Sequence, residues 1–113
     1  MDKDKERLGH ILDAINQINA IKLSLSYDEF VRNLATKWAL VKLVEIIGEA
    51  CIKITIETKD KYHEIKWKQI AGTRHILVHD YNVIDFPLLW EILEKEIPIL
   101  EEQVDNIYNS ILN

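Results

Sequence analysis

The apolar residues of this chain recur at intervals of three and four, which places them on one side of an α-helix. One stripe of this kind predicts a helix over residues 3–22, and a capping box formed by Ser26 and Glu29 predicts the start of a second helix over 27–57, with room for a break. A third helix is expected over 67–81. The stripe of the last helix begins after Asp85, a good N-cap, and has Leu89, Leu93, Ile97, Leu100, Val104, Ile107 and Ile111 at heptad-like spacing.

Two stretches depart from a simple amphipathic pattern. From residue 38 to 56 apolar side chains fall on almost every face, so this part of the second helix should be buried on more than one side. We therefore expect one face to pack in the core and another to meet a second copy of the chain. Pro98 lacks a backbone N–H and should kink or split the last helix near residues 94–97.

The expected fold is all-α, an antiparallel up-and-down bundle of four to five helices that forms one domain over residues 1–113 and assembles as a homodimer. Strand-like alternation does not occur in the sequence, and glycine and proline are scarce. The charged stretch 58–61 is interpreted as an exposed connection. His10 and His63 lie off the apolar stripes and are expected at the surface.

Composition narrows the function. The chain has 113 residues and a formal net charge of −5, which argues against a broad basic face for nucleic acid, so any RNA contact must be a local positive pocket. No apolar run is long enough to span a membrane and no signal peptide opens the chain, so a cytoplasmic location without membrane contact is expected. The single Cys51 forms no internal disulfide and is expected to be a small buried hydrophobe.

The helix over 67–81 carries the candidate chemistry. Arg74 interrupts its apolar stripe, and a charge on an apolar face is costly unless it is paired or used. His79, Asp80 and Tyr81 follow within eight residues. At about 100° per residue, Arg74 and Tyr81 lie within about 20° of each other, but Arg74 and His79 are about 140° apart. Either the helix ends or bends near residue 78, or one site takes its Arg and His from two copies of the chain.

The segment from Arg74 to Tyr81 resembles the R-x4-H-x-Y motif of the HepT-like toxins, a branch of the HEPN superfamily. The resemblance extends over nearly the whole chain, including the Ile-Gly-Glu-Ala run at 47–50, the Trp-x2-Ile-Ala-Gly sequence before the motif and the acidic last helix. The sequence departs from the family pattern at Thr73, where Met is expected, and at His75, where Asn is commoner.

The resemblance implies a ribonuclease, and the residues agree with it. Metal-independent RNA cleavage needs proton transfer and a cation on the phosphate, because the 2′-hydroxyl nucleophile is already in the substrate. His79 is assigned as general acid or base and Arg74 as the phosphate clamp, with no cofactor. His75, Glu49 and Asp80 are candidate supporting residues.

Alternatives to this interpretation stay open. Arg74 could instead be a structural ion-pair partner of Glu49 or Asp80, and Glu49 could belong with Glu45 to a solvated stripe. His75 and His79, four residues apart, could bind a metal, although no third ligand pattern is present.

The resemblance also implies a partner. In this family the motif tyrosine, here Tyr81, receives AMP from a minimal nucleotidyltransferase that acts as the antitoxin. An adenylate near the Arg74 face would add negative charge and bulk and exclude RNA. The second class of function is a non-catalytic helical dimer that serves as an adaptor or substrate-binding subunit of a nucleotidyltransferase.

Overall fold

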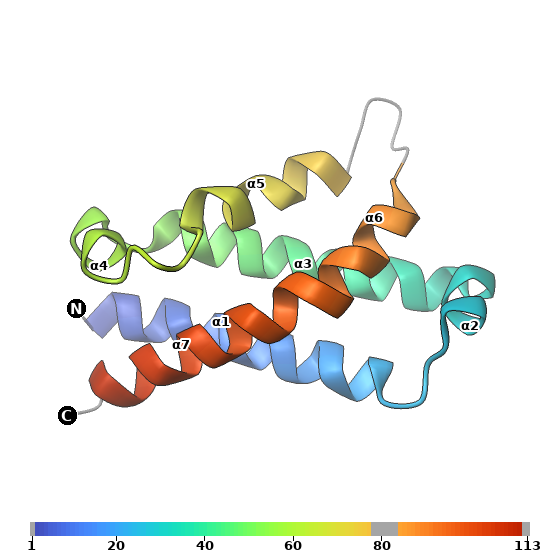
Figure 1. The fold of residues 1–113 in the computed structure, drawn as a ribbon, viewed down its shortest axis with the longest axis horizontal. Coiled ribbons are helices and arrows are strands. Elements are labelled where there is room, and N and C mark those ends of the chain that lie inside the picture. The colour runs from blue at the N-terminus through green and yellow to red at the C-terminus, as the bar shows by residue number, and fades with distance from the viewer. Residues whose placement is uncertain (1, 78–83, 112–113) are drawn as a thin grey trace.

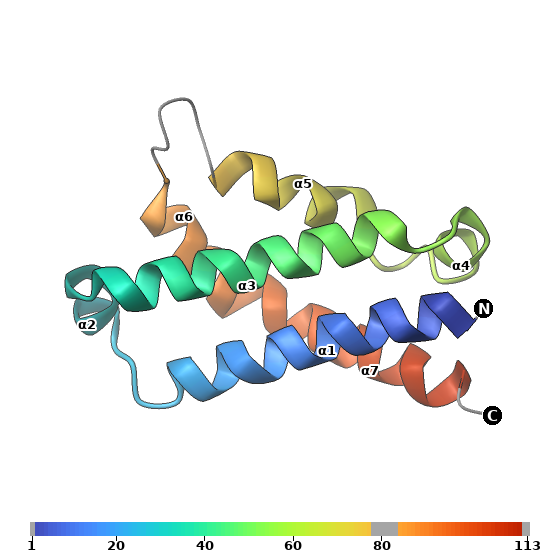
Figure 2. The same cartoon turned by 180° about the vertical axis from the view of Figure 1, so that it is seen from behind.

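The structure, a computed structural model, describes residues 2–77 and 84–111 and is built from helices and short turns in both ranges (Figure 1). The long helices α1 (Asp2–Lys22) and α3 (Leu34–Lys53) lie side by side and run in opposite directions (Figure 2). α5 (Trp67–Leu77) packs along the other side of α3, and α7 (Ile97–Ile111) packs against α1. The prediction of an all-α fold is confirmed.

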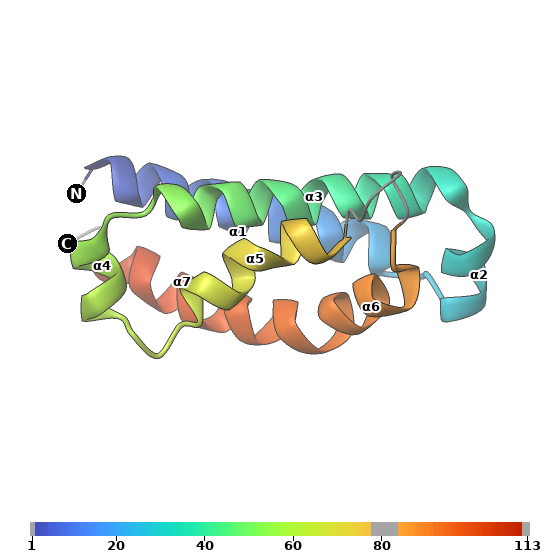
Figure 3. The same ribbon diagram turned by 90° about the horizontal axis from the view of Figure 1, so that it is seen from above.

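The helices enclose one hydrophobic cluster. Seen from above, α1 and α3 lie on one side of the molecule and α7 on the other (Figure 3). The stripe predicted for residues 3–22 is buried, with Leu8, Ile11, Ile15 and Ile18 fully enclosed. The radius of gyration is 14.2 Å, near the value of about 13 Å expected for a compact domain of this length. No helix in the described ranges combines the length and apolar character needed to cross a bilayer.

The apolar run from residue 38 to 56, which has apolar side chains on almost every face, is largely explained by packing within one chain. α3 lies between α1 and α5, and its residues Leu40, Val41, Leu43, Val44, Ile47 and Cys51 are buried. Cys51 is thus a buried free thiol, as expected, and burial raises its pKa to about 12. Trp38, Ile46 and Ile52 stay 45%, 37% and 41% exposed. Ile56, the last residue of the run, is 75% exposed. The second copy of the chain remains a prediction, and these exposed residues support it.

The predicted second helix is divided at Asn33. The short helix α2 (Tyr27–Arg32) begins with the expected capping box, in which Glu29 N donates to Ser26 Oγ and Ser26 N donates to Glu29 Oε1. Asn33 then leaves the helical conformation, and its side chain accepts a 2.9 Å hydrogen bond from Thr36 N at the start of α3. Asparagine favours such caps over helix interiors because its side chain competes for backbone groups.

The interpretation of residues 58–61 as an exposed connection is correct for Asp60 and Lys61, which are exposed, but wrong for the segment as a whole. These residues belong to α4 (Ile56–Lys61), and Thr58 is buried. Thr58 Oγ1 donates a hydrogen bond to the buried carboxylate of Asp4, which also accepts two from Thr55, the N-cap of α4. The sequence carries no local sign of this contact because Asp4 lies in α1, more than fifty residues earlier.

The last helical segment is distorted before Pro98, as predicted. α6 (Phe86–Glu91) begins at Asp85, whose side chain accepts a 3.0 Å hydrogen bond from Leu88 N. A π-helical turn, η2 (Ile92–Glu96), then connects α6 to α7. A π-turn shifts the backbone pairing by one residue, and such turns occur where the regular hydrogen-bond ladder is interrupted.

Candidate functional site

The helix that carries the motif is fixed at its first residue. Trp67 N donates to Ile65 O at 2.9 Å, and the indole Nε1 of Trp67 donates to Tyr62 O at 3.1 Å. The indole is only 6% exposed and belongs to the hydrophobic cluster, which Ile70 and Ala71 join from the next turn. This anchoring holds the first turns of α5 against α3 and sets the path along which the motif follows.

The motif itself lies mostly beyond what the structure describes. Arg74 and His75 belong to α5 by their backbone, but their side chains lie outside the described residues, as do His79, Asp80 and Tyr81 entirely. The relative positions of Arg74 and His79 therefore remain a prediction. The two alternatives named above, a helix that bends near residue 78 and a metal bound by His75 and His79, stay open. Within the described ranges, no group of three His, Cys, Asp or Glu side chains is arranged to hold a metal ion.

Glu49 of α3 lines a groove between α3 and α1. Glu45 and Glu49 line this groove together with basic side chains of both helices. The basic residues are Arg7, His10, Lys42 and Lys53. Glu49 is exposed to solvent there. Its role in orienting Arg74 or His79 stays a prediction, because it depends on side chains outside the described residues. His10 is exposed, as expected, and lies 4.0 Å from Glu6.

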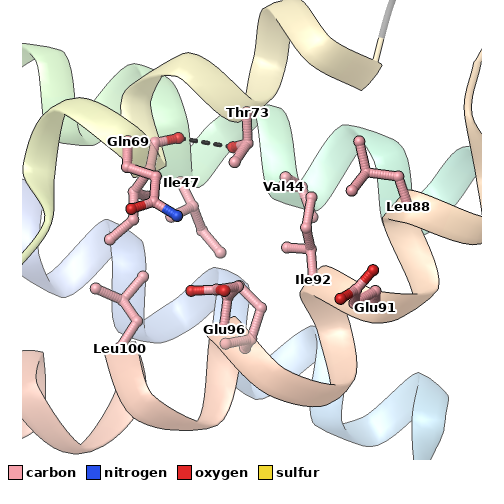
Figure 4. A pocket seen from close by; sticks show the side chains of 11 residues that line it. Val44, Ile47, Gln69, Thr73, Leu88, Glu91, Ile92, Glu96 and Leu100 are labelled. Atoms are coloured by element: carbon pink, nitrogen blue, oxygen red, sulfur yellow. Dashed lines mark hydrogen bonds between the residues drawn. The ribbon is translucent and has the colours of Figure 1, made fainter.

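A cavity of about 170 Å³ lies between α3, α5 and the α6–α7 segment (Figure 4). Val44 and Ile47 of α3 and Leu100 of α7 supply apolar walls, and Thr73 of α5 turns its hydroxyl to the Ile70 carbonyl oxygen at 2.6 Å. The ionised side chains among the described residues that line it are both carboxylates, Glu91 and Glu96. A cavity of this character does not suit an RNA phosphate.

A second hollow, at the first turn of α5, is lined mainly by positive side chains, in contrast to the carboxylates of the first cavity. This groove, with a volume of about 820 Å³, is open to solvent and lies between the end of α3, α4 and the start of α5. Three lysines and one aspartate line it, Lys59, Lys66, Lys68 and Asp60, together with His63, which is exposed as expected. Sequence reasoning did not single out these lysines; their density between residues 59 and 68 was the available signal.

Comparison with known proteins identifies relatives over nearly the whole chain. The family model described as "Ribonuclease HepT-like" matches residues 11–107. A Methanocaldococcus jannaschii protein named "Putative RNase MJ1380" is 34% identical over 101 residues, which cover 89% of this chain and 93% of the relative. The "Probable ribonuclease HepT" of Thermococcus cleftensis is 30% identical over 103 residues, covering 91% of this chain and 94% of the relative. No solved structure matches this chain.

Proposed function

Because this chain belongs to the HepT-like ribonuclease family, we propose that it is an endoribonuclease that cleaves RNA without a metal ion at a site built from Arg74 and His79. The observation that carries the proposal is the family match over residues 11–107, which includes the whole Arg74–Tyr81 motif. The expected active form is a HEPN-like helical bundle paired as a homodimer.

The two residues divide the reaction between them. In the proposed reaction a general base removes the proton of the 2′-hydroxyl, whose oxygen attacks phosphorus, and the bond from phosphorus to the 5′-oxygen breaks as a general acid protonates that oxygen. His79 carries out proton transfer, since imidazole titrates near neutral pH. The Arg74 guanidinium keeps its charge and presents a fork of donors that fits two non-bridging phosphate oxygens.

A homodimer supplies these groups twice. On a regular helix the positions of Arg74 and His79 differ by about 140°, so two copies facing each other provide a base, an acid and the cation more readily than one straight helix. His75, Glu49 and Asp80 are proposed to support the pair by hydrogen bonding and by orienting Arg74 or His79.

Regulation is proposed to act on Tyr81. A minimal nucleotidyltransferase acting as antitoxin would transfer AMP from ATP to the phenol oxygen, releasing pyrophosphate, and would silence a toxic ribonuclease. The added phosphate and nucleoside would compete with RNA for Arg74, because both present an anionic phosphate to the same guanidinium.

The test is cleavage of a defined single-stranded RNA by the purified protein in EDTA, with the products analysed for 2′,3′-cyclic phosphate ends. His79→Ala and Arg74→Ala should each reduce the rate by roughly 100-fold or more, because each removes a group required in the transition state. His10→Ala and Arg32→Ala are matched controls at exposed positions of α1 and α2 and should keep full activity. Loss of activity on chelation would contradict the metal-independent mechanism.

A second function is supported by the acidic surface. The net charge of −5 weakens long-range attraction to RNA and suits a helical adaptor or substrate-binding subunit of a nucleotidyltransferase. Stable binding of the nucleotidyltransferase by a protein that cleaves no RNA would favour this adaptor over the ribonuclease.

A further inference from the structure

The groove at the start of α5 stands out against the charge of the whole chain. The protein carries a net charge of −5, yet the ionised residues lining this groove are Lys59, Lys66 and Lys68 against Asp60 alone. Lys66 and Lys68 are exposed. Local clusters of lysine in an otherwise acidic protein concentrate anions at one place on the surface.

Backbone groups add to this positive character. The groove is lined by residues 66–69, where α5 begins, and the first turn of α5 contains no acidic residue. The N–H of Trp67 is paired with Ile65 O, but the N-terminal end of a helix also carries a partial positive charge, which favours phosphate. The lysines and the helix end therefore act on the same space.

One wall of the groove is apolar. Ile52, on the last turn of α3, is 41% exposed and forms part of the wall. Lys59 Nζ lies 3.5 Å from the Ile52 carbonyl oxygen, so one cation is held beside this apolar surface. Trp67 also lines the groove and is held in place by its hydrogen bond to Tyr62 O. A nucleotide has a phosphate that suits the cations and a base whose face suits an apolar wall.

The groove lies one to two helical turns before the motif on the same helix. Ala71 lines it, and positions 74 and 75 follow Ala71 by three and four residues on the same helix. Lys68 and Arg74 are six residues apart, which corresponds to about 9 Å along the axis of α5. A strand whose scissile phosphate is at Arg74 would therefore reach the groove with its neighbouring nucleotides.

We propose that this groove binds the phosphate backbone of the RNA strand on one side of the scissile bond, with Lys66 and Lys68 as the principal contacts. This proposal rests on the ribonuclease function proposed above and names how the acidic protein holds its substrate. The groove lies at the α4 end of α3, whereas the exposed Trp38 lies near its other end, so pairing of two chains through the Trp38 end of α3 leaves the groove open.

The test separates binding from cleavage. A fluorescent 12-nucleotide RNA with 2′-O-methyl groups has no free 2′-hydroxyl and cannot be cut, so its affinity can be measured by anisotropy at several salt concentrations. The double variant Lys66→Gln/Lys68→Gln should bind more weakly. The negative slope of log K, where K is the association constant, against log salt should become shallower by about 1.4, since each lost contact to a single strand removes about 0.7. With cleavable RNA, KM should rise while kcat stays unchanged.

The matched control is Lys3→Gln/Lys95→Gln, which removes the same charge from exposed positions on α1 and η2 and should bind RNA as the parent does. The variant Lys66→Arg/Lys68→Arg should restore the salt slope. If the parent protein binds the probe through these lysines but cuts no RNA, the proposed ribonuclease activity is refuted, whereas the proposed RNA-binding role of the groove is supported.

Three results would contradict the proposal that the groove binds RNA. The first is unchanged affinity and salt slope in Lys66→Gln/Lys68→Gln while the parent cleaves RNA. The second is a ten-residue polyglutamate peptide that binds as tightly as the RNA probe, which would indicate an acidic protein segment as the natural occupant. The third is a parent protein that does not bind the probe even at low salt.

Discussion

Lys22 Nζ donates a 3.1 Å hydrogen bond to the carbonyl oxygen of Leu93, 71 residues later in the chain. In the π-turn before α7, Ile97 N pairs with Ile92 O, five residues back. The next carbonyl in this pattern is that of Leu93, and its partner would be the N–H of residue 98, which is proline and has none. The end of α1 thus supplies the hydrogen bond that Pro98 removes.

This relationship predicts a dependence between two distant substitutions. Lys22→Met should lower the free energy of unfolding by about 1 to 3 kcal/mol, because it leaves the partly buried Leu93 carbonyl without this donor. The same substitution should cost less in a Pro98→Ala background, where residue 98 can donate instead. Urea denaturation of the four proteins gives the coupling energy. The 3.3 Å ion pair of Lys22 with Glu94 is lost in both backgrounds and cancels, so equal losses would contradict the explanation.

The Asp4 carboxylate predicts a loss of stability in acid. Burial alone would raise its pKa, but hydrogen bonds from Thr55 and Thr58 outweigh burial and hold the pKa below the ordinary value of 3.8. A lowered pKa in the folded state means that Asp4 stabilises the fold above about pH 4 and that this contribution is lost as the pH falls through the folded value.

Asp4→Asn should accordingly lower the free energy of unfolding by about 1 to 3 kcal/mol at pH 7 and flatten the acid limb of the stability curve. Asp13→Asn, at an exposed position of the same helix, is the control and should leave both unchanged. Denaturant titrations from pH 7 to pH 3 measure the effect. An acid limb that is identical in Asp4→Asn and the parent would show that other groups control it.

Pairing of two chains is predicted to use the exposed apolar residues of α3 together with the motif helix. Light scattering at micromolar concentration should report twice the 13.3 kDa chain mass. Ile46→Glu places a charge on this face and should shift the protein toward the monomer, because an unpaired charge is costly in an apolar interface. Leu23→Glu changes a more exposed residue beyond the end of α1 and should remain dimeric. A parent chain that is monomeric would refute a site shared by two copies.

The proposed role of Tyr81 predicts a separation of activity from silencing. Tyr81→Phe should keep most of the ribonuclease activity, because neither proton transfer nor phosphate binding requires the phenol. The variant lacks the acceptor oxygen and should gain no adenylate when incubated with the nucleotidyltransferase and ATP, as measured by intact-mass spectrometry. Loss of activity equal to that of His79→Ala would place Tyr81 in the catalytic set. Continued adenylation would move the modification to Tyr27, Tyr62 or Tyr108.

Local signals in the sequence predicted much of the helical framework. The periodic stripe of α1, the capping box at Ser26 and the N-cap at Asp85 act within a few residues, so they can be recognised without knowing the fold. The motif around Arg74 and its family were recognised in the same way, because a spacing along one helix is itself a local property.

The tertiary structure decided what depends on residues distant in the chain. Thr58 is buried within the otherwise largely exposed helix α4, where Asp4 accepts its hydrogen bond, and the apolar faces of α3 proved to be covered mainly by α1 and α5. Lys59 and Lys68 line one groove only because α4 and α5 meet at the end of α3. The sequence by itself determined where the long helices form, but not the short helix α4, and which family motif the chain carries. Which polar and charged side chains face one another was decided by packing, since each such contact joins groups that no local pattern connects.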